Sequence, residues 1–196
     1  ENTHNVCGGK GLPLCFMKDL KEMAESQNIP IHMDGARIWN ACNALELSPC
    51  DIAKYADSLS VCLSKGLGAP VGSLLVGSND FITKAKRIRK ALGGGMRQSG
   101  ILASAGLIAL DDFESGILKQ DHLYAKMLTS AIQKHKIFQI NKVDTNIIFI
   151  NIHLKYTVKY TGNIASEIVG MFKKRGILLS AWSPFLLRIV VHRDIS

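Results

Sequence analysis

The first clear hydrophobic pattern along the chain has the periodicity of a helix. Over residues 14–27 apolar positions recur at helical spacing, while lysines and glutamates occupy the opposite face, which predicts an amphipathic helix. Short runs at 29–33, 57–63 and 72–77 predict strands, and each ends at a glycine or within three residues of one. Further helices are expected at 36–44, 79–91 and 97–112. This alternation of helices and strands predicts an α/β domain with a mainly parallel sheet.

The pattern changes in the last part of the chain. There, β-rich runs follow one long helical segment and flank a second, shorter one. The expected elements are a helix up to about residue 136, strands at 137–141 and 146–152, a helix at 163–175, and strands at 177–182 and 186–191. We therefore expect a large domain over residues 1–113 and a small α+β domain over residues 114–196.

Composition narrows the class of protein. The 196 residues are 47% hydrophobic and 20% charged, which excludes intrinsic disorder. The net charge of +8 is spread over both halves, and no nucleic-acid motif accompanies it, so we expect no nucleic-acid partner. The densest basic stretch, residues 84–97, is either a solvated helix face or an anion site. The apolar runs are too short to span a membrane, so no membrane partner is expected.

The cysteines indicate the compartment. All five lie in the first third of the chain, none forms a C-x-x-C pair, and no histidine follows at zinc-finger spacing. We therefore expect no metal site and reduced thiols, which predict the cytoplasm. The chain starts at Glu1 without a methionine, so we expect a fragment of a longer protein, and a mitochondrial location stays open.

One lysine lies among small, apolar and glycine residues with no acid beside it, in the stretch Cys62-Leu-Ser-Lys-Gly-Leu-Gly-Ala-Pro-Val-Gly72. Burial in such surroundings penalises a charged ammonium, so Lys65 is expected to offer a free amine that forms a Schiff base. A lysine that reaches solvent from a glycine-rich turn is the structural alternative. Taken alone, the stretch is a weak signal.

Asp34 and Arg37 follow the predicted strand at 29–33. A carboxylate at a strand end can form an ion pair, bind a metal or hold a protonated ring nitrogen, and Arg37 at a helix start can bind an anionic oxygen. An N-cap aspartate and a surface arginine are the structural alternatives. In α/β folds the functional residues usually lie at the carboxyl ends of strands, and Asp34 and Lys65 are both expected there.

The turn Gly93-Gly-Gly-Met-Arg-Gln98 joins two predicted helices. It is either a flexible linker or, with Arg97 at a helix start, an anion site.

Together these segments resemble the low-specificity L-threonine aldolases, in the β-eliminating-lyase branch of the pyridoxal-phosphate-dependent transferase-like fold (fold type I). The resemblance is dense to about residue 110 and sparser beyond. It is carried by Glu1-Asn-Thr-His-Asn5, His32-Met-Asp-Gly-Ala-Arg37, Asp57-Ser58, the lysine stretch, Arg89-Lys-Ala-Leu-Gly-Gly-Gly-Met-Arg-Gln98 and, more weakly, Arg188-Ile-Val-Val-His-Arg-Asp194.

The resemblance implies a cofactor site for pyridoxal 5'-phosphate. Lys65 would form the Schiff base with it, and Asp34 would pair with the pyridinium nitrogen. Arg37 would lie by the ring hydroxyl. Arg97 and Lys90 would lie near the cofactor phosphate or the rim of the site. A protonated ring nitrogen makes the cofactor an electron sink for a developing carbanion.

The resemblance also implies a reaction, the retro-aldol cleavage of a small β-hydroxy amino acid. L-Threonine and L-allo-threonine would give glycine and acetaldehyde, with Arg188 holding the substrate α-carboxylate. The general base stays open among His4, His32, His192, a water and the cofactor phosphate. A homo-oligomer is the expected assembly, as a dimer of dimers when the protein is full length.

Measured against the family, the chain is expected to be incomplete. The sheet of the large domain should lack strands on its N-terminal side, and the small domain should lack its last helix. An inactive truncated or pseudogene-like remnant is therefore one alternative. A β-elimination on the same scaffold is another, since Lys65 and Asp34 would serve both reactions.

Overall fold

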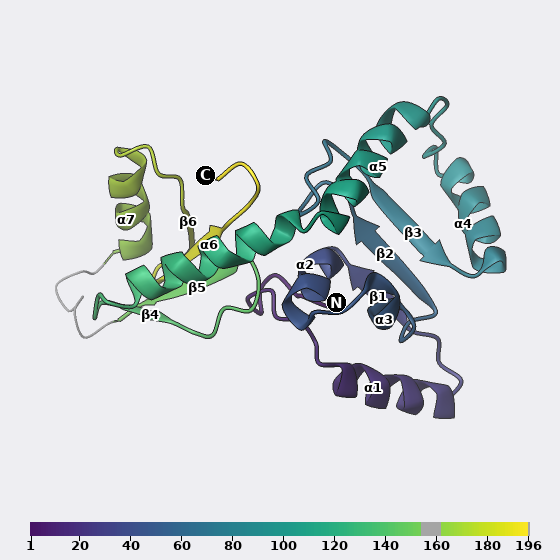
Figure 1. Cartoon of the computed structure of the whole chain (residues 1–196), viewed down its shortest axis with the longest axis horizontal. Coiled ribbons are helices and arrows are strands. Elements are labelled where there is room, and N and C mark those ends of the chain that lie inside the picture. Colours follow the sequence, from purple (N-terminus) through teal and green to yellow (C-terminus); the bar gives the residue numbers. More distant parts are fainter. Residues whose placement is uncertain (154–161, 196) are drawn as a thin grey trace. The chain divides into compact units, whose positions relative to one another are not determined.

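The computed structural model describes residues 1–153 and 162–195. These residues form two compact units, Glu1–Lys119 and Gln120–Ser196, which Figure 1 shows in the colours of the sequence. The units divide within one helix, whereas the sequence places a domain boundary after residue 113; that boundary stays a prediction. Within the described ranges, no helix is long and apolar enough to cross a membrane.

The first unit alternates helices and strands, as predicted. Its elements are α1 (Leu14–Ser26), β1 (His32–Gly35), α2 (Ile38–Leu45), α3 (Pro49–Ala53), β2 (Ser58–Cys62), β3 (Ser73–Gly77), α4 (Asn79–Ala91), α5 (Gly100–Glu114) and the start of α6 (Ile117–Ile132). The sequence analysis did not predict α3. Its signal is present, because Ser48 and Asp51 form a capping box around Pro49 at the helix start.

The sheet of this unit has the order β1-β2-β3. β1 and β2 are parallel, whereas β2 and β3 are antiparallel. The predicted α/β class is confirmed, and its sheet is mixed over the described residues. The connections explain the mixture: α2 and α3 form a crossover between β1 and β2, but only the short helix-free segment 63–72 joins β2 to β3.

Strand β1 begins later than the apolar run predicts. Pro30 has no N–H to donate, and the Ile31 N–H donates instead to Asp57 Oδ2 at 2.7 Å. Regular pairing with β2 starts only at His32 and continues through Asp34 to Gly35. Asp34 therefore lies inside the end of the strand rather than after it.

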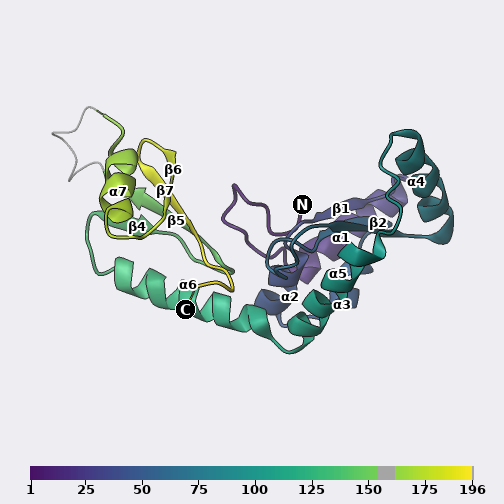
Figure 2. The same ribbon diagram turned by 90° about the horizontal axis from the view of Figure 1, so that it is seen from above.

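One face of β1 and β2 forms the core of the first unit. Met33, Leu59 and Val61 are buried there against α2, α3 and α5, and Figure 2 shows α1, α2, α3 and α5 on one side of the two strands. The opposite face carries His32 and Asp34, which are exposed. The alternation of strand residues thus separates an apolar core face from a polar face.

The second unit consists of a four-stranded antiparallel sheet with helices against it. The strands are β4 (Phe138–Ile140), β5 (Ile147–Ile152), β6 (Ser180–Ser183) and β7 (Leu186–Val190), in the order β4-β5-β7-β6, and α7 spans Ile164–Lys173. Ile148, Ile150 and Leu187 of the sheet are buried against Ala125 of α6 and Ile168 of α7. This is the α+β arrangement that the sequence predicts.

Candidate active site

Two predicted site residues reach the same edge of the sheet. β1 and β2 are parallel, with Asp34 opposite Ser60 and Gly35 opposite Val61. Asp34 is the penultimate residue of β1, and Lys65 comes three residues after Cys62, where β2 ends. Because parallel strands end at the same edge, Asp34 and the loop that carries Lys65 both lie at the carboxyl end of this pair.

The Asp34 side chain is exposed, and its orientation is fixed locally. Its Oδ1 accepts a hydrogen bond from the Ala36 N–H at 2.9 Å. The N-cap residue of α2 is Arg37, not Asp34, so the structural alternative of an N-cap aspartate does not apply. Arg37 is half-buried directly beyond the strand end. The short turn between β1 and α2 therefore presents a carboxylate and a guanidinium within four residues of each other.

Glycines fix the backbone beside both residues. A Cβ on Gly35 would lie 2.8 Å from both Leu59 Cδ1 and the Ser60 carbonyl oxygen, and one on Gly66 would lie 2.8 Å from Asn40 Oδ1. Such distances are shorter than real Cβ contacts, so a side chain at either position would displace its surroundings. Close packing therefore holds the chain directly after Asp34 and after Lys65.

Lys65 is exposed, so the expectation that it is buried is wrong for the described residues. The apolar residues of its stretch explain this, because Leu63, Leu67 and Ala69 turn into the core. The loop is closed by hydrogen bonds from Gly68 N–H to the Lys65 carbonyl oxygen and from Ala69 N–H to the Leu63 carbonyl oxygen. Lys65 is thus a solvent-reachable amine on an anchored loop.

Cys62, at the end of β2, is a neighbour that the sequence analysis did not single out. Burial acts to raise the pKa of its thiol, but hydrogen bonding to Ser64, the positive charge of Lys65 and the Ser73 side chain outweigh burial, and the pKa is lowered. The Cys62 Sγ lies 3.4 Å from Ser64 Oγ. The charge of Lys65 therefore acts on the strand end itself.

The three candidate histidines lie in different places. His32 Nδ1 is 2.9 Å from Ser58 Oγ, at the beginning of β1 and β2. His4 lies in the segment before α1, with Nε2 3.5 Å from Glu1 Oε2. His192 belongs to the second unit, where Nδ1 is 3.5 Å from Asp194 Oδ2. His4 and His32 thus share a unit with Lys65.

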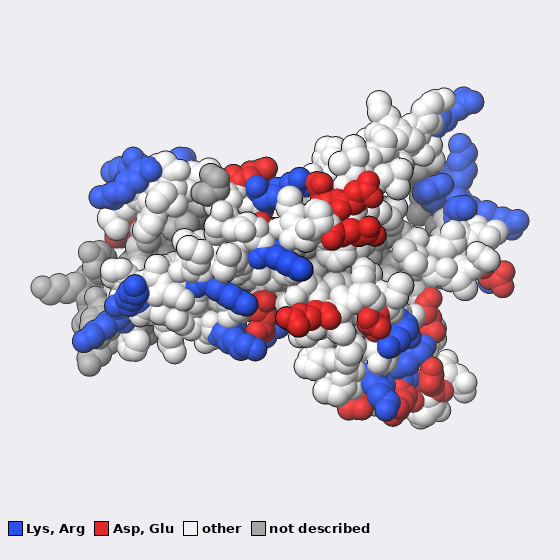
Figure 3. Space-filling model, in the orientation of Figure 1, with Lys and Arg blue, Asp and Glu red and all other residues white. Residues whose placement is uncertain are grey.

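Arg97 lies in the loop before α5 rather than at a helix start. The helix begins at Gly100, because Gln98 has a φ of +52°, which interrupts a right-handed helix. This corrects the expectation of a helix from residue 97. The lysines and arginines of α4 are exposed, and Figure 3 shows blue side chains gathered over this helix. For these residues the solvated-face interpretation agrees with the structure.

Arg188 belongs to β7 of the second unit. It pairs with Phe149 on β5 and Ser180 on β6. Its guanidinium carbon lies 5.4 Å from the centre of the Trp182 ring, a cation–π contact that orients the planar fork. The first unit therefore carries Asp34, Arg37, Lys65 and Arg97, and the second carries Arg188.

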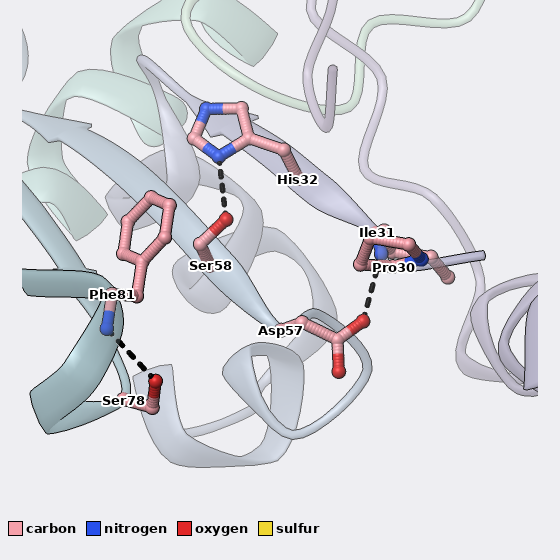
Figure 4. A pocket seen from close by; sticks show the side chains of 7 residues that line it. All are labelled: Pro30, Ile31, His32, Asp57, Ser58, Ser78 and Phe81. Atoms are coloured by element: carbon pink, nitrogen blue, oxygen red, sulfur yellow. Dashed lines mark hydrogen bonds between the residues drawn. The ribbon is translucent and has the colours of Figure 1, made fainter. Parts of the chain in front are cut away.

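A pocket of about 490 Å³ lies at the other end of β1 and β2. Figure 4 shows its lining, which comes from the beginnings of these strands and from the start of α4. The lining residues are Pro30, Ile31, His32, Asp57, Ser58, Ser78 and Phe81. Of the candidate residues, His32 alone borders it, so this pocket and the Asp34–Lys65 edge are separate places.

Comparison with known proteins places the chain in a family. The family model described as beta-eliminating lyase matches residues 1–155. Among curated relatives, the probable low-specificity L-threonine aldolase 2 of Arabidopsis thaliana is 42% identical over 100% of the chain and 54% of its own length. The low specificity L-threonine aldolase of Escherichia coli (strain K12) gives the same identity and coverage. The chain thus spans about half the length of these relatives.

Solved structures share the fold. A putative L-allo-threonine aldolase of Listeria monocytogenes superposes with a TM-score of 0.80 at 21% identity, over 97% of this chain and 54% of that one. An ornithine aminotransferase of Plasmodium yoelii gives 0.65 at 14% identity, over 98% and 52%. The predicted fold-type-I class is therefore confirmed. By its sequence and its fold, the chain belongs to the beta-eliminating lyase family.

Proposed function

We propose that the protein is a pyridoxal-phosphate-dependent aldehyde-lyase that cleaves L-threonine and L-allo-threonine to glycine and acetaldehyde. One observation carries the proposal. Asp34 and Lys65 reach the same strand edge in a chain that is 42% identical, over its whole length, to proteins named low-specificity threonine aldolases.

The donor set at this edge suits the proposed cofactor. Lys65 offers a primary amine, the group that condenses with an aldehyde. Asp34 offers an oriented carboxylate for a protonated ring nitrogen, and Arg37 a guanidinium for a phenolic oxygen. When bound, the cofactor supplies an electron sink for the carbanion that carbon–carbon cleavage leaves. We propose that Lys65 Nζ, which is accessible to solvent, accepts and donates protons during the reaction.

Two further arginines, one in each unit, have proposed roles. Arg97 is proposed to contact the cofactor phosphate, and its loop position leaves the side chain exposed. Arg188 is proposed to bind the substrate α-carboxylate through two parallel N–H donors. Its place in the middle of β7 and its contact with Trp182 support this role, because a planar group held on a strand loses little freedom on binding.

For the general base we propose His4, which takes the β-hydroxyl proton so that the aldehyde can leave. Its segment is bonded to the carboxyl end of β1, because the Asn2 N–H donates to the Asp34 carbonyl oxygen at 3.2 Å. His32 is bonded to Ser58 at the other end of the strands. Of the two histidines in the first unit, His4 is therefore the one whose segment is bonded to the strand end that carries Asp34, and this supports the proposal.

A homo-oligomer, a dimer of dimers, is the proposed assembly. Large apolar side chains of α5 and of the residue that follows α4 are exposed, among them Leu92 at 82%, Ile101 at 74% and Leu107 at 64%. Exposed large apolar side chains on neighbouring segments are typical of an interface. Light scattering on the purified protein measures the assembly directly.

The activity is tested on the purified protein with pyridoxal phosphate. The expected result is a cofactor absorbance band that persists through gel filtration and release of glycine and acetaldehyde from both threonine isomers. The family name makes β-elimination the second candidate, and it would appear as a keto acid with ammonia. A bound cofactor without glycine release would contradict the aldolase proposal. Absence of the cofactor band would favour an inactive remnant.

A further inference from the structure

We propose that Asn2 and Thr3 are positioning residues, which fix His4 to the strand end that carries Asp34. The inference rests on the proposed function, since it assigns these two residues to the same site. It starts from their burial: Asn2 is 1% exposed and Thr3 is 0% exposed, although both are polar. Polar side chains are rarely buried so completely unless their hydrogen bonds are met and the segment has a fixed place.

Asn2 joins three parts of the first unit. Its N–H donates to the Asp34 carbonyl oxygen at 3.2 Å, at the end of β1. Its side-chain Oδ1 accepts from the Leu12 N–H at 3.0 Å, and its Nδ2 donates to Met17 Sδ of α1 at 3.6 Å. With the bond from Ala36 to its carboxylate, Asp34 is therefore held from both sides.

Thr3 turns the chain away from this anchor in an unusual conformation. Its φ is +62°, in the left-handed region that glycine and asparagine tolerate and that a β-branched residue rarely adopts. The Thr3 N–H donates to the Lys10 carbonyl oxygen at 3.1 Å, and its hydroxyl donates to the Asn2 carbonyl oxygen. Stability alone favours glycine at such a position, so the strained threonine indicates a functional constraint.

The segment also holds the backbone of the next residue, His4. The His4 carbonyl oxygen accepts from the Cys7 N–H at 3.1 Å and from the Gly9 N–H at 3.0 Å, so the backbone of His4 is fixed. Its imidazole is 46% exposed. A fixed backbone with an accessible imidazole is what a proton-transferring side chain needs. Asn2 and Thr3 supply the first property without touching substrate.

The first experiment uses Thr3→Gly in the cofactor-loaded protein, with Glu46→Gly as its control. Glu46 is another left-handed residue, with a φ of +55°, at the C-cap of α2. Glu46→Gly should keep a urea midpoint near that of the wild type, since the relief of strain offsets the extra freedom of glycine in the unfolded chain. Thr3→Gly also loses a buried side chain and its hydroxyl bond, so its midpoint is measured to show that the variant is folded under the assay conditions. Only Thr3→Gly should lower kcat for L-threonine, by roughly tenfold to hundredfold, with KM nearly unchanged.

Retention of wild-type kcat in Thr3→Gly would overturn the inference and make Thr3 an ordinary turn residue. Should Thr3→Gly fail to fold, Thr3→Asn tests the same criteria, because asparagine tolerates the left-handed region.

The second experiment tests whether Asn2 holds the strand end that carries Asp34, with a measurement that does not depend on catalysis. Asn2→Ala removes the side-chain bonds to Leu12 and Met17, so the strand end that holds Asp34 should loosen. We expect the pH midpoint of the bound cofactor's absorbance to move in Asn2→Ala and to stay unchanged in Glu46→Gly. An unchanged midpoint in Asn2→Ala would contradict the role of Asn2. Failure of the wild-type protein to cleave threonine would instead overturn the proposed function, and this absorbance test would still apply; failure to bind the cofactor would overturn both.

Discussion

The two ends of the β1–β2 pair differ in packing and in chemistry. At the carboxyl end the backbone is crowded, with no space for a Cβ on Gly35 or Gly66, and Asn2 is buried beside Asp34. At the amino end the same strands open into the pocket beside His32 and Ser58. The presence of a pocket therefore does not by itself identify the proposed catalytic residues. In this unit the amine and the carboxylate are at the crowded end, where the backbone can hold them in place.

The largest difference between the two ends should come from Lys65→Ala. We expect activity to fall by about a thousandfold or more, because the covalent partner of the cofactor is lost. The urea midpoint should not change, since Lys65 is exposed. The control is Lys54→Ala, an exposed lysine beside Tyr55. Steady-state kinetics measure the effect, and wild-type activity in Lys65→Ala would break the comparison.

Asp34→Asn and Asp57→Asn compare a carboxylate at each end. Asp34→Asn should lower kcat by roughly a hundredfold to a thousandfold, because an amide does not stabilise a protonated ring nitrogen. Asp57→Asn should leave kcat unchanged, since Asp57 contacts Lys21 and Ile31 at the amino end. Equal losses in the two variants would remove the distinction between the ends.

Gly66→Ala tests the crowding at the carboxyl end. The added Cβ would meet Asn40 Oδ1 at 2.8 Å and Leu118 Cδ2 at 3.2 Å, so we expect about 1–3 kcal/mol of destabilisation. Gly100→Ala is the matched control, because nothing lies within 4 Å of a Cβ there. The free energy of unfolding in urea is the measurement. A Gly66→Ala protein as stable as the control would show that this end is not tightly packed.

The smallest effect concerns pH and the amino end. The hydrogen bond from Lys21, and then that from the Ile31 N–H, lower the pKa of Asp57. Its stabilisation is therefore present above the unfolded-state pKa of the carboxyl and is lost as pH falls through the lowered value. Because Asp57 is exposed, we expect less than about 1 kcal/mol. The difference in unfolding free energy between wild type and Asp57→Asn should exist at neutral pH and vanish in acid; a constant difference would contradict this origin.

Local patterns predicted most of the fold. The apolar period of α1, the runs of β2 and β3 and the glycine turn after α4 all lie where the sequence places them. The start of β1 did not follow its apolar run, because the Asp57 side chain takes the Ile31 N–H. That bond joins residues far apart in the chain, and a local pattern contains no information about it.

The candidate site was predictable in its chemistry and less so in its environment. The spacing of the motifs placed Asp34 and Lys65 at strand ends. The burial expected for Lys65 was wrong, because its apolar neighbours pack into the core while Lys65 itself faces solvent. Which side chains of a loop face the core is decided only when the loop folds. Cys62 and Thr3 carried no signal of their own. The lowered thiol pKa arises from Ser64 and Lys65 around it, and the strain at Thr3 is a property of its backbone angle.

The most direct test of the Asp34–Lys65 edge is chemical trapping of the cofactor. The purified protein is loaded with pyridoxal phosphate, treated with borohydride to make the link to its amine permanent, digested and mapped by mass spectrometry. The account predicts the phosphopyridoxyl group on Lys65, and loss of the label at this position in Lys65→Ala. A label on another lysine of the wild-type protein, with Lys65 unmodified, would contradict it.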